Sequence, residues 1–177
     1  MFLDGHPEWR GRVRMLAHLN PSREGVPEYR RYLKECQAEV ERINGRLGRG
    51  GWEPIRLSLK DDYPTALAAY SLYDVLLVNS VFDGMNLVAK EGPILNGRAG
   101  AVILSENAGA AAELGRHALM VNPFDVAATA DAIAAGLHMA EGERQRRAEG
   151  LQRAVRRNRL SDWVSRQVAD LSRKNGP

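Results

Sequence analysis

The sequence lacks the features on which membrane, secreted and metal-binding proteins depend. No run approaches the roughly 20 consecutive apolar residues of a membrane span. Residues 1–7 carry neither the basic stretch nor the long apolar segment of a secretory signal. Cys36 is the single cysteine among 177 residues, and the four histidines show no metal-ligand spacing. We therefore expect a cytoplasmic protein that has no internal disulfide, contacts no membrane and needs no metal or other cofactor.

Aromatic residues are also scarce, which bears on the basic C-terminal stretch. Residues 144–174 hold nine arginines and one lysine against three acidic residues. Such a stretch can bind nucleic acid. Its only aromatic residue is Trp163, and it matches no nucleic-acid recognition motif. We interpret these arginines as solvated helix faces or as contacts to a further domain, and we do not expect nucleic-acid binding.

Strand and helix patterns alternate along the chain. Hydrophobic residues make up 44% and charged residues 27% of the sequence, as in ordinary globular domains. The predicted strands are 13–17, 55–59, 74–78, 101–104 and 119–121, and the predicted helices are 26–47, 65–73, 87–96, 126–139, 141–157 and 161–173. This order predicts an α/β fold with a doubly wound parallel sheet.

Polar residues follow several of the predicted strands directly. Arg23 follows the first strand, Asp83 the third, and residues 105–109 the fourth. In doubly wound sheets the ligand binds at the carboxyl ends of the strands. We therefore expect these residues to border one binding site.

Residues 79–92, NSVFDGMNLVAKEG, combine a strand end, a polar turn and a helix start. Backbone N–H groups at a helix N-terminus can hold an anion. Asp83 before the helix and Glu91 within it would repel a phosphate in direct contact. We interpret both carboxylates as acceptors for sugar hydroxyls on either side of a diphosphate, which predicts a nucleotide-sugar site. The structural alternative is a plain strand-to-helix turn with Asn86 as N-cap.

The segment Asp83–Glu91, DGMNLVAKE, resembles the signature of the trehalose-6-phosphate synthase family of retaining glycosyltransferases. Weaker similarity continues in order on both sides, at residues 21–24, 104–105, 108–110, 113–114 and 121–125. The resemblance implies the Rossmann-like C-terminal lobe of a GT-B glycosyltransferase, incomplete at its N-terminus. Residues 1–158 would form this nucleotide-sugar-binding lobe. Residues 159–177 would form a C-terminal helix that crosses back to an N-terminal lobe.

The resemblance also assigns roles in binding the two substrates. In the family, matching positions hold the glucosyl hydroxyls of the donor, its diphosphate, its ribose hydroxyls and the phosphate of the acceptor. By this resemblance, Asp83 and the backbone amides of Gly84, Met85 and Asn86 hold the glucosyl hydroxyls. The backbone amides of Leu87 and Val88 hold the diphosphate. Glu91 holds the ribose hydroxyls, and Arg23 binds the phosphate of the acceptor. The implied donor is a nucleotide sugar such as UDP-glucose or GDP-glucose. The implied acceptor is a phosphorylated sugar or polyol.

Parts of the family's enzyme have no counterpart in this sequence. No segment matches the family's upstream basic motif, in which an arginine and a lysine neutralise the donor diphosphate, or its N-terminal acceptor lobe. Charge develops on the leaving diphosphate in the transition state and needs cationic stabilisation. We therefore expect no complete catalytic set and no useful activity from this chain alone. The missing strand and helix should also leave exposed sheet edges and apolar surface.

The sequence leaves three points open. Asn79-Ser80 stands where trehalose-6-phosphate synthases have a Thr-Pro pair, so a glucosylglycerol-phosphate synthase or a pseudoglycosyltransferase is an alternative within the family. A second alternative is a catalytically silent binding or regulatory module that keeps the fold. Homo-oligomerisation is open as well.

Overall fold

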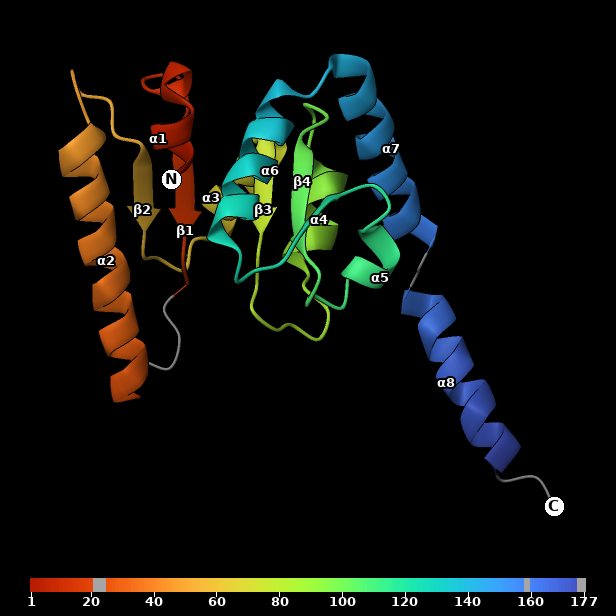
Figure 1. The fold of residues 1–177 in the computed structure, drawn as a ribbon. Coiled ribbons are helices and arrows are strands. Elements are labelled where there is room, and N and C mark those ends of the chain that lie inside the picture. Colours follow the sequence, from red (N-terminus) through yellow and green to blue (C-terminus); the bar gives the residue numbers. More distant parts are fainter. Residues whose placement is uncertain (21–24, 158–159, 175–177) are drawn as a thin grey trace. The chain divides into compact units, whose positions relative to one another are not determined.

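The computed structural model describes residues 1–20, 25–157 and 160–174, which fall into two compact units, Met1–Ala69 and Tyr70–Pro177. Each unit contains one parallel sheet with helices beside it (Figure 1). The predicted α/β class is therefore confirmed. The boundary expected between residues 158 and 159 lies outside the described residues. Within the described ranges, no helix is both long and apolar enough to cross a membrane.

The first unit is built around two parallel strands. Its elements are α1 (Phe2–Gly5), the 3-10 helix η1 (Pro7–Trp9), β1 (Met15–His18), α2 (Pro27–Leu47), β2 (Ile55–Ser58) and the start of α3 (Tyr63–Leu72). Strands β1 and β2 run in register from Met15 opposite Ile55. The side chain of Asn44 ties α2 to β2, because it donates to the carbonyl of Ile55 at 2.8 Å and accepts from its N–H at 3.0 Å.

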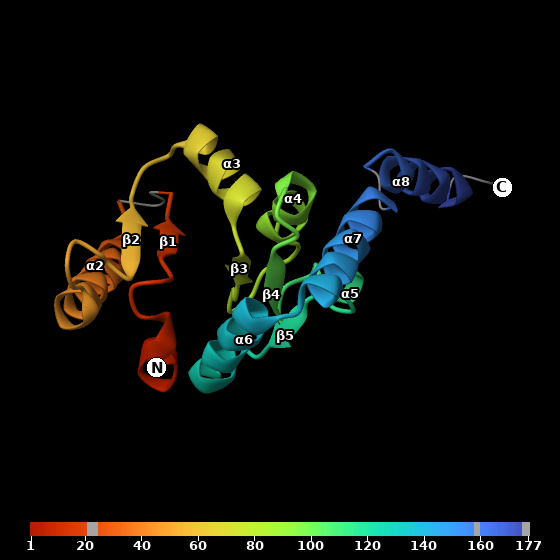
Figure 2. The same ribbon diagram turned by 90° about the horizontal axis from the view of Figure 1, so that it is seen from above.

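The second unit contains a three-stranded sheet in the order β3-β4-β5. Its elements after α3 are β3 (Val75–Val78), α4 (Val88–Leu95), β4 (Ala101–Ser105), α5 (Ala111–Leu114), β5 (Leu119–Val121), α6 (Val126–His138), α7 (Glu141–Arg157) and α8 (Leu160–Lys174). Helix α6 covers one face of the sheet, and α4 and α7 cover the other (Figure 2). All five residues of β4 are buried, as expected of a central parallel strand covered on both faces.

The predicted helices and strands agree with the observed ones to within about two residues. The three short helices α1, η1 and α5 were missed. They span three or four residues each, too few for an apolar repeat of helical period.

Apolar side chains are exposed on β1 and α8. Met15 is 47% and Leu16 is 58% exposed, and β1 pairs with β2 alone among the strands that the structure describes. On α8, Trp163, Val168 and Leu171 are each more than half exposed. The expected exposure of apolar surface is therefore confirmed for the described residues.

The buried amide side chain of Asn96 joins the turn before β3 to the turn before β4. Asn96 is 8% exposed. Its Nδ2 donates to the carbonyls of Tyr70 and Tyr73 at 3.1 and 3.0 Å. Its Oδ1 accepts from the N–H groups of Arg98 and Gly100 at 3.0 and 2.8 Å. Both donors and both acceptor positions of the amide are satisfied, so this one side chain fixes where β3 and β4 begin.

We predict that Asn96→Ala lowers the free energy of unfolding by about 2–4 kcal/mol, because four backbone groups, in one buried and three partly buried hydrogen bonds, lose their partner. Urea denaturation followed by circular dichroism measures this loss. Gln145→Ala is the control, since Gln145 bonds only to Glu149 on an exposed surface, and it should cost less than about 0.5 kcal/mol. Equal stability of the two variants would contradict the role assigned to Asn96.

Candidate functional site

The turn after β3 is held by a relay of side-chain hydrogen bonds. The Oδ1 of Asp83 accepts from the N–H of Met85, and its Oδ2 accepts from the Nδ2 of Asn86, both at 3.0 Å. The Oδ1 of Asn86 in turn accepts from the N–H of Ala89 at 3.0 Å. Asn86 has a φ of 75°, in the left-handed region that Asn tolerates better than most residues. Asp83 therefore shapes the turn, in addition to any contact with a ligand.

Helix α4 begins at Val88, one residue later than predicted, and its N-cap position is Leu87. Asn86, the N-cap in the structural alternative, lies one position earlier, and its side chain still satisfies the amide of Ala89 in the first turn. The cap leaves other amides open. Within the described ranges, the backbone N–H groups of Gly84, Asn86, Leu87 and Val88 have no hydrogen-bond partner.

The turn after β3 is also bonded to the loop after β4. The carbonyl of Asp83 accepts from the N–H of Gly109 at 2.9 Å, and the carbonyl of Met85 accepts from the N–H of Ala110 at 2.8 Å. Asn107 in the same loop also donates from its Nδ2 to the carbonyl of Val81 at 2.9 Å. In the other direction, the N–H of Asp83 donates to the carbonyl of Asn107 at 3.3 Å. The two loops therefore form one backbone-paired edge at the carboxyl ends of β3 and β4.

Gly109 is required by this pairing. A Cβ at position 109 would overlap the carbonyl oxygen of Gly84. The small residues at 108–111 lead into α5 and leave room for a close backbone approach. The structure shows that the close approach is to the neighbouring loop.

Lys90 and Glu91, which are adjacent in α4, have different environments. The Nζ of Lys90 lies 2.7 Å from the Oε2 of Glu113 on α5, with 23% and 18% of the two side chains exposed. Glu113 therefore neutralises the charge of Lys90. Glu91 is partly buried, and its carboxylate has no hydrogen-bond or ion-pair partner among the described residues. Both oxygens of Asp83, the other acid of the signature segment, already accept a hydrogen bond.

The other predicted site residues are placed only in part. Arg23 lies outside the described residues. Ser105 is the last residue of β4 and not the first residue after it, and its hydroxyl accepts from the N–H of Asn107 at 3.1 Å. No group of three or more metal-ligating side chains within residues 1–20, 25–157 and 160–174 could hold a metal ion.

Sequence analysis missed an exposed aromatic pair beside the turn. Phe82 is 79% and Phe124 is 65% exposed, and their ring centroids lie 6.5 Å apart in an edge-to-face arrangement. Phe82 follows β3 and Phe124 follows β5, so their pairing depends on the sheet order. Two phenylalanines 42 positions apart give no sequence signal of this contact.

Three comparisons place these features among known proteins. The sequence profile of glycosyltransferase family 20 matches residues 1–173. The bifunctional trehalose-6-phosphate synthase/phosphatase of Thermoproteus tenax is 45% identical over 165 residues, which are 92% of this chain and 22% of that protein. The chain thus spans about a fifth of the length of this relative.

Solved structures show the same similarity in three dimensions. An E. coli structure bound with UDP-2-fluoro glucose has a TM-score of 0.90 and 34% identity, over 96% of this chain and 38% of its own. A UDP-forming alpha,alpha-trehalose-phosphate synthase from Burkholderia xenovorans in complex with glucose-6-phosphate has a TM-score of 0.92 and 34% identity, over 97% and 38%.

We predict that Gly109→Ala lowers the free energy of unfolding by about 1–3 kcal/mol, because a methyl group there forces the two loops apart. Gly84→Ala is the matched control, since a Cβ at Gly84 meets nothing within 4 Å. Chemical denaturation of both variants measures the difference. Equal stability would show that the two loops do not approach as closely as the hydrogen bonds of Gly109 indicate.

Proposed function

Because this chain belongs to glycosyltransferase family 20, we propose that it is the donor-binding part of a retaining glycosyltransferase that moves glucose from a nucleotide sugar to a phosphorylated acceptor. The observation that carries the proposal is the set of open backbone amides at the start of α4, next to the free carboxylate of Glu91. Relatives solved with UDP-2-fluoro glucose and with glucose-6-phosphate support both substrate classes.

The open amides suit the diphosphate of the donor. The N–H groups of Leu87 and Val88 lie at the N-terminus of α4, where the helix dipole also favours an anion. Lys90 adds little positive charge here, because Glu113 neutralises it. We therefore assign diphosphate binding in this segment to the backbone of Leu87 and Val88. Their side chains need no part in it.

The two carboxylates suit the hydroxyl groups on either side of that diphosphate. Each oxygen of Asp83 accepts one hydrogen bond from the protein and keeps a further lone pair for a glucosyl hydroxyl. The open amides of Gly84 and Asn86 lie in the same turn. Glu91 keeps both oxygens available, so it can accept from the two ribose hydroxyls together.

The remaining parts of the proposal rest on the family resemblance. Arg23 would bind the acceptor phosphate, for which a planar guanidinium is well suited. The acceptor would be a phosphorylated sugar or polyol, and the reaction would take place in the cytoplasm. The cations that stabilise the leaving diphosphate would come from the family's upstream arginine and lysine, which no segment of this sequence matches.

We predict that Glu91→Gln weakens UDP-glucose binding by about 1–3 kcal/mol, because the ribose hydroxyls lose a charged acceptor. Isothermal titration calorimetry on the purified chain measures the change. Glu41→Gln is the matched control: it removes the same charge from an exposed position on α2 and should leave the affinity unaltered.

A parallel titration with GDP-glucose compares the two nucleotides. Unchanged affinity of Glu91→Gln for both donors would contradict the ribose assignment. The absence of binding of either donor to the wild-type chain would contradict the proposed donor-binding function itself.

A further inference from the structure

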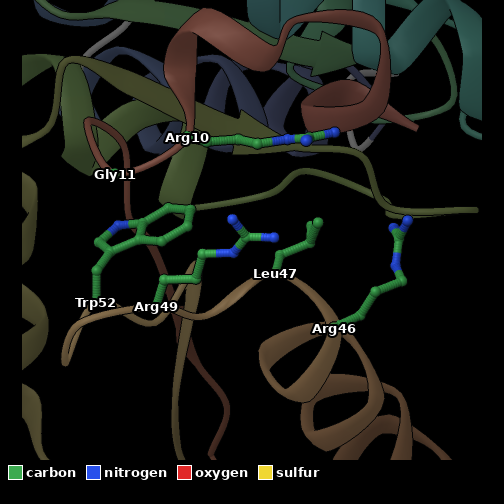
Figure 3. Close-up of a pocket in the computed structure, with 6 residues that line it drawn as sticks. All are labelled: Arg10, Gly11, Arg46, Leu47, Arg49 and Trp52. Atoms are coloured by element: carbon green, nitrogen blue, oxygen red, sulfur yellow. The ribbon is translucent and has the colours of Figure 1, made fainter.

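The first unit contains an arginine-lined pocket of about 220 Å³ that the proposed function does not use (Figure 3). We call it the Arg49 pocket. Its lining residues are Arg10, Gly11, Arg46, Leu47, Arg49 and Trp52. All of them precede β1 or β2 in the chain, so the pocket lies toward the amino ends of these strands. The pocket shares no residue with the turn after β3 or with α4, so the Arg49 pocket is a separate site.

A tight hairpin presents Arg49 and Trp52 together. Arg49 donates its N–H to the carbonyl of Trp52 at 3.2 Å, and Trp52 donates to the carbonyl of Arg49 at 3.0 Å. The two residues between them are Gly50 and Gly51, with φ of 58° and 80°. Positive φ at both positions is typical of a two-residue hairpin turn. Residues paired in this way project to the same face, so the hairpin places a guanidinium beside an indole.

The apolar wall of the pocket is fixed in position. The Nε1 of Trp52 donates to the carbonyl of Val13 at 2.9 Å, which holds the indole ring in one orientation. Figure 3 shows the guanidinium of Arg49 between the indole of Trp52 and the side chain of Leu47. A charged fork next to a fixed apolar surface suits a ligand that has an anionic group and an apolar or ring-shaped body.

The charges of the pocket are not balanced. Asp4 accepts from both Nη atoms of Arg46 at 2.9 and 3.0 Å. Arg10 lies 3.6 Å from the same carboxylate. The hydrogen bonds from Arg46 lower the pKa of Asp4 to about 2, so its carboxylate is ionised at neutral pH. The guanidinium of Arg49 has no partner among the described residues. Two guanidiniums and the N-terminal ammonium, which lies 3.3 Å from Asp4, therefore share one carboxylate. With the unpaired Arg49, the pocket has an excess of positive charge.

We propose that the Arg49 pocket binds a small phosphate monoester. Guanidinium groups match the geometry of phosphate oxygens, and a dianion would balance the excess charge. Trp52 and Leu47 would contact the body of the ligand. The volume is below the roughly 300–1,000 Å³ of pockets for drug-sized ligands, so the ligand is about the size of a phosphorylated monosaccharide or smaller. The proposal does not depend on the function proposed for the donor site.

The test titrates phenyl phosphate into the full chain and follows the Nε1–H resonance of Trp52 by NMR. We expect a saturable shift that Arg49→Gln weakens by about tenfold or more, since a charged hydrogen-bonding partner is lost. Arg49→Lys, which keeps the charge but not the planar fork, should fall between the two. Arg116→Gln is the matched control: it removes one exposed arginine of the second unit and should leave the affinity unchanged.

Two further ligands separate the contribution of the phosphate charge from that of the aromatic ring. Inorganic phosphate should bind more weakly than phenyl phosphate, and phenol should not bind. Equal affinity for the two phosphates would contradict the role of Trp52. An equal loss of affinity in Arg49→Gln and Arg116→Gln would show that phenyl phosphate is attracted by the net charge of the chain alone. This result would overturn the site. If Arg23→Gln abolished the binding of phenyl phosphate and Arg49→Gln left it unchanged, the ligand would bind at Arg23, the proposed acceptor residue. This result would also overturn the Arg49 site.

Discussion

The candidate donor site depends on the hydrogen-bonded relay from Asp83 through Asn86 to Ala89. These bonds hold Asn86 in a left-handed conformation and cap the first turn of α4. The same turn is paired by its backbone with the loop after β4, where only glycine fits at position 109. The turn is thus built before any ligand arrives, and preorganised donors cost little to align when an anion binds.

The relay determines which groups remain for a ligand. It uses the amides of Met85 and Ala89, and the ion pair with Glu113 uses Lys90. The amides of Leu87 and Val88 and the carboxylate of Glu91 are left open. Donors thus lie at the helix start and an acceptor lies within α4. That distribution fits a diphosphate flanked by hydroxyl-bearing groups better than it fits an isolated phosphate.

Much of this could be predicted from the sequence, because the signals are local. Apolar runs marked the five strands. The resemblance of residues 83–91 supplied the ligand class. Contacts set by tertiary structure could not be predicted, such as the Phe82–Phe124 pair or the steric need for Gly109. The Gly50-Gly51 pair did carry a hairpin signal, but only the structure shows that the hairpin lines an arginine pocket.

The central claim is that backbone amides at the start of α4 hold the donor diphosphate. The most direct measurement is a titration of the ¹⁵N-labelled chain with UDP-glucose, followed by the backbone amide resonances of Leu87 and Val88. The account predicts that these two amides shift downfield by more than those of Met85 and Ala89, whose hydrogen bonds are already made within the turn. Saturable binding that leaves Leu87 and Val88 unshifted would contradict it.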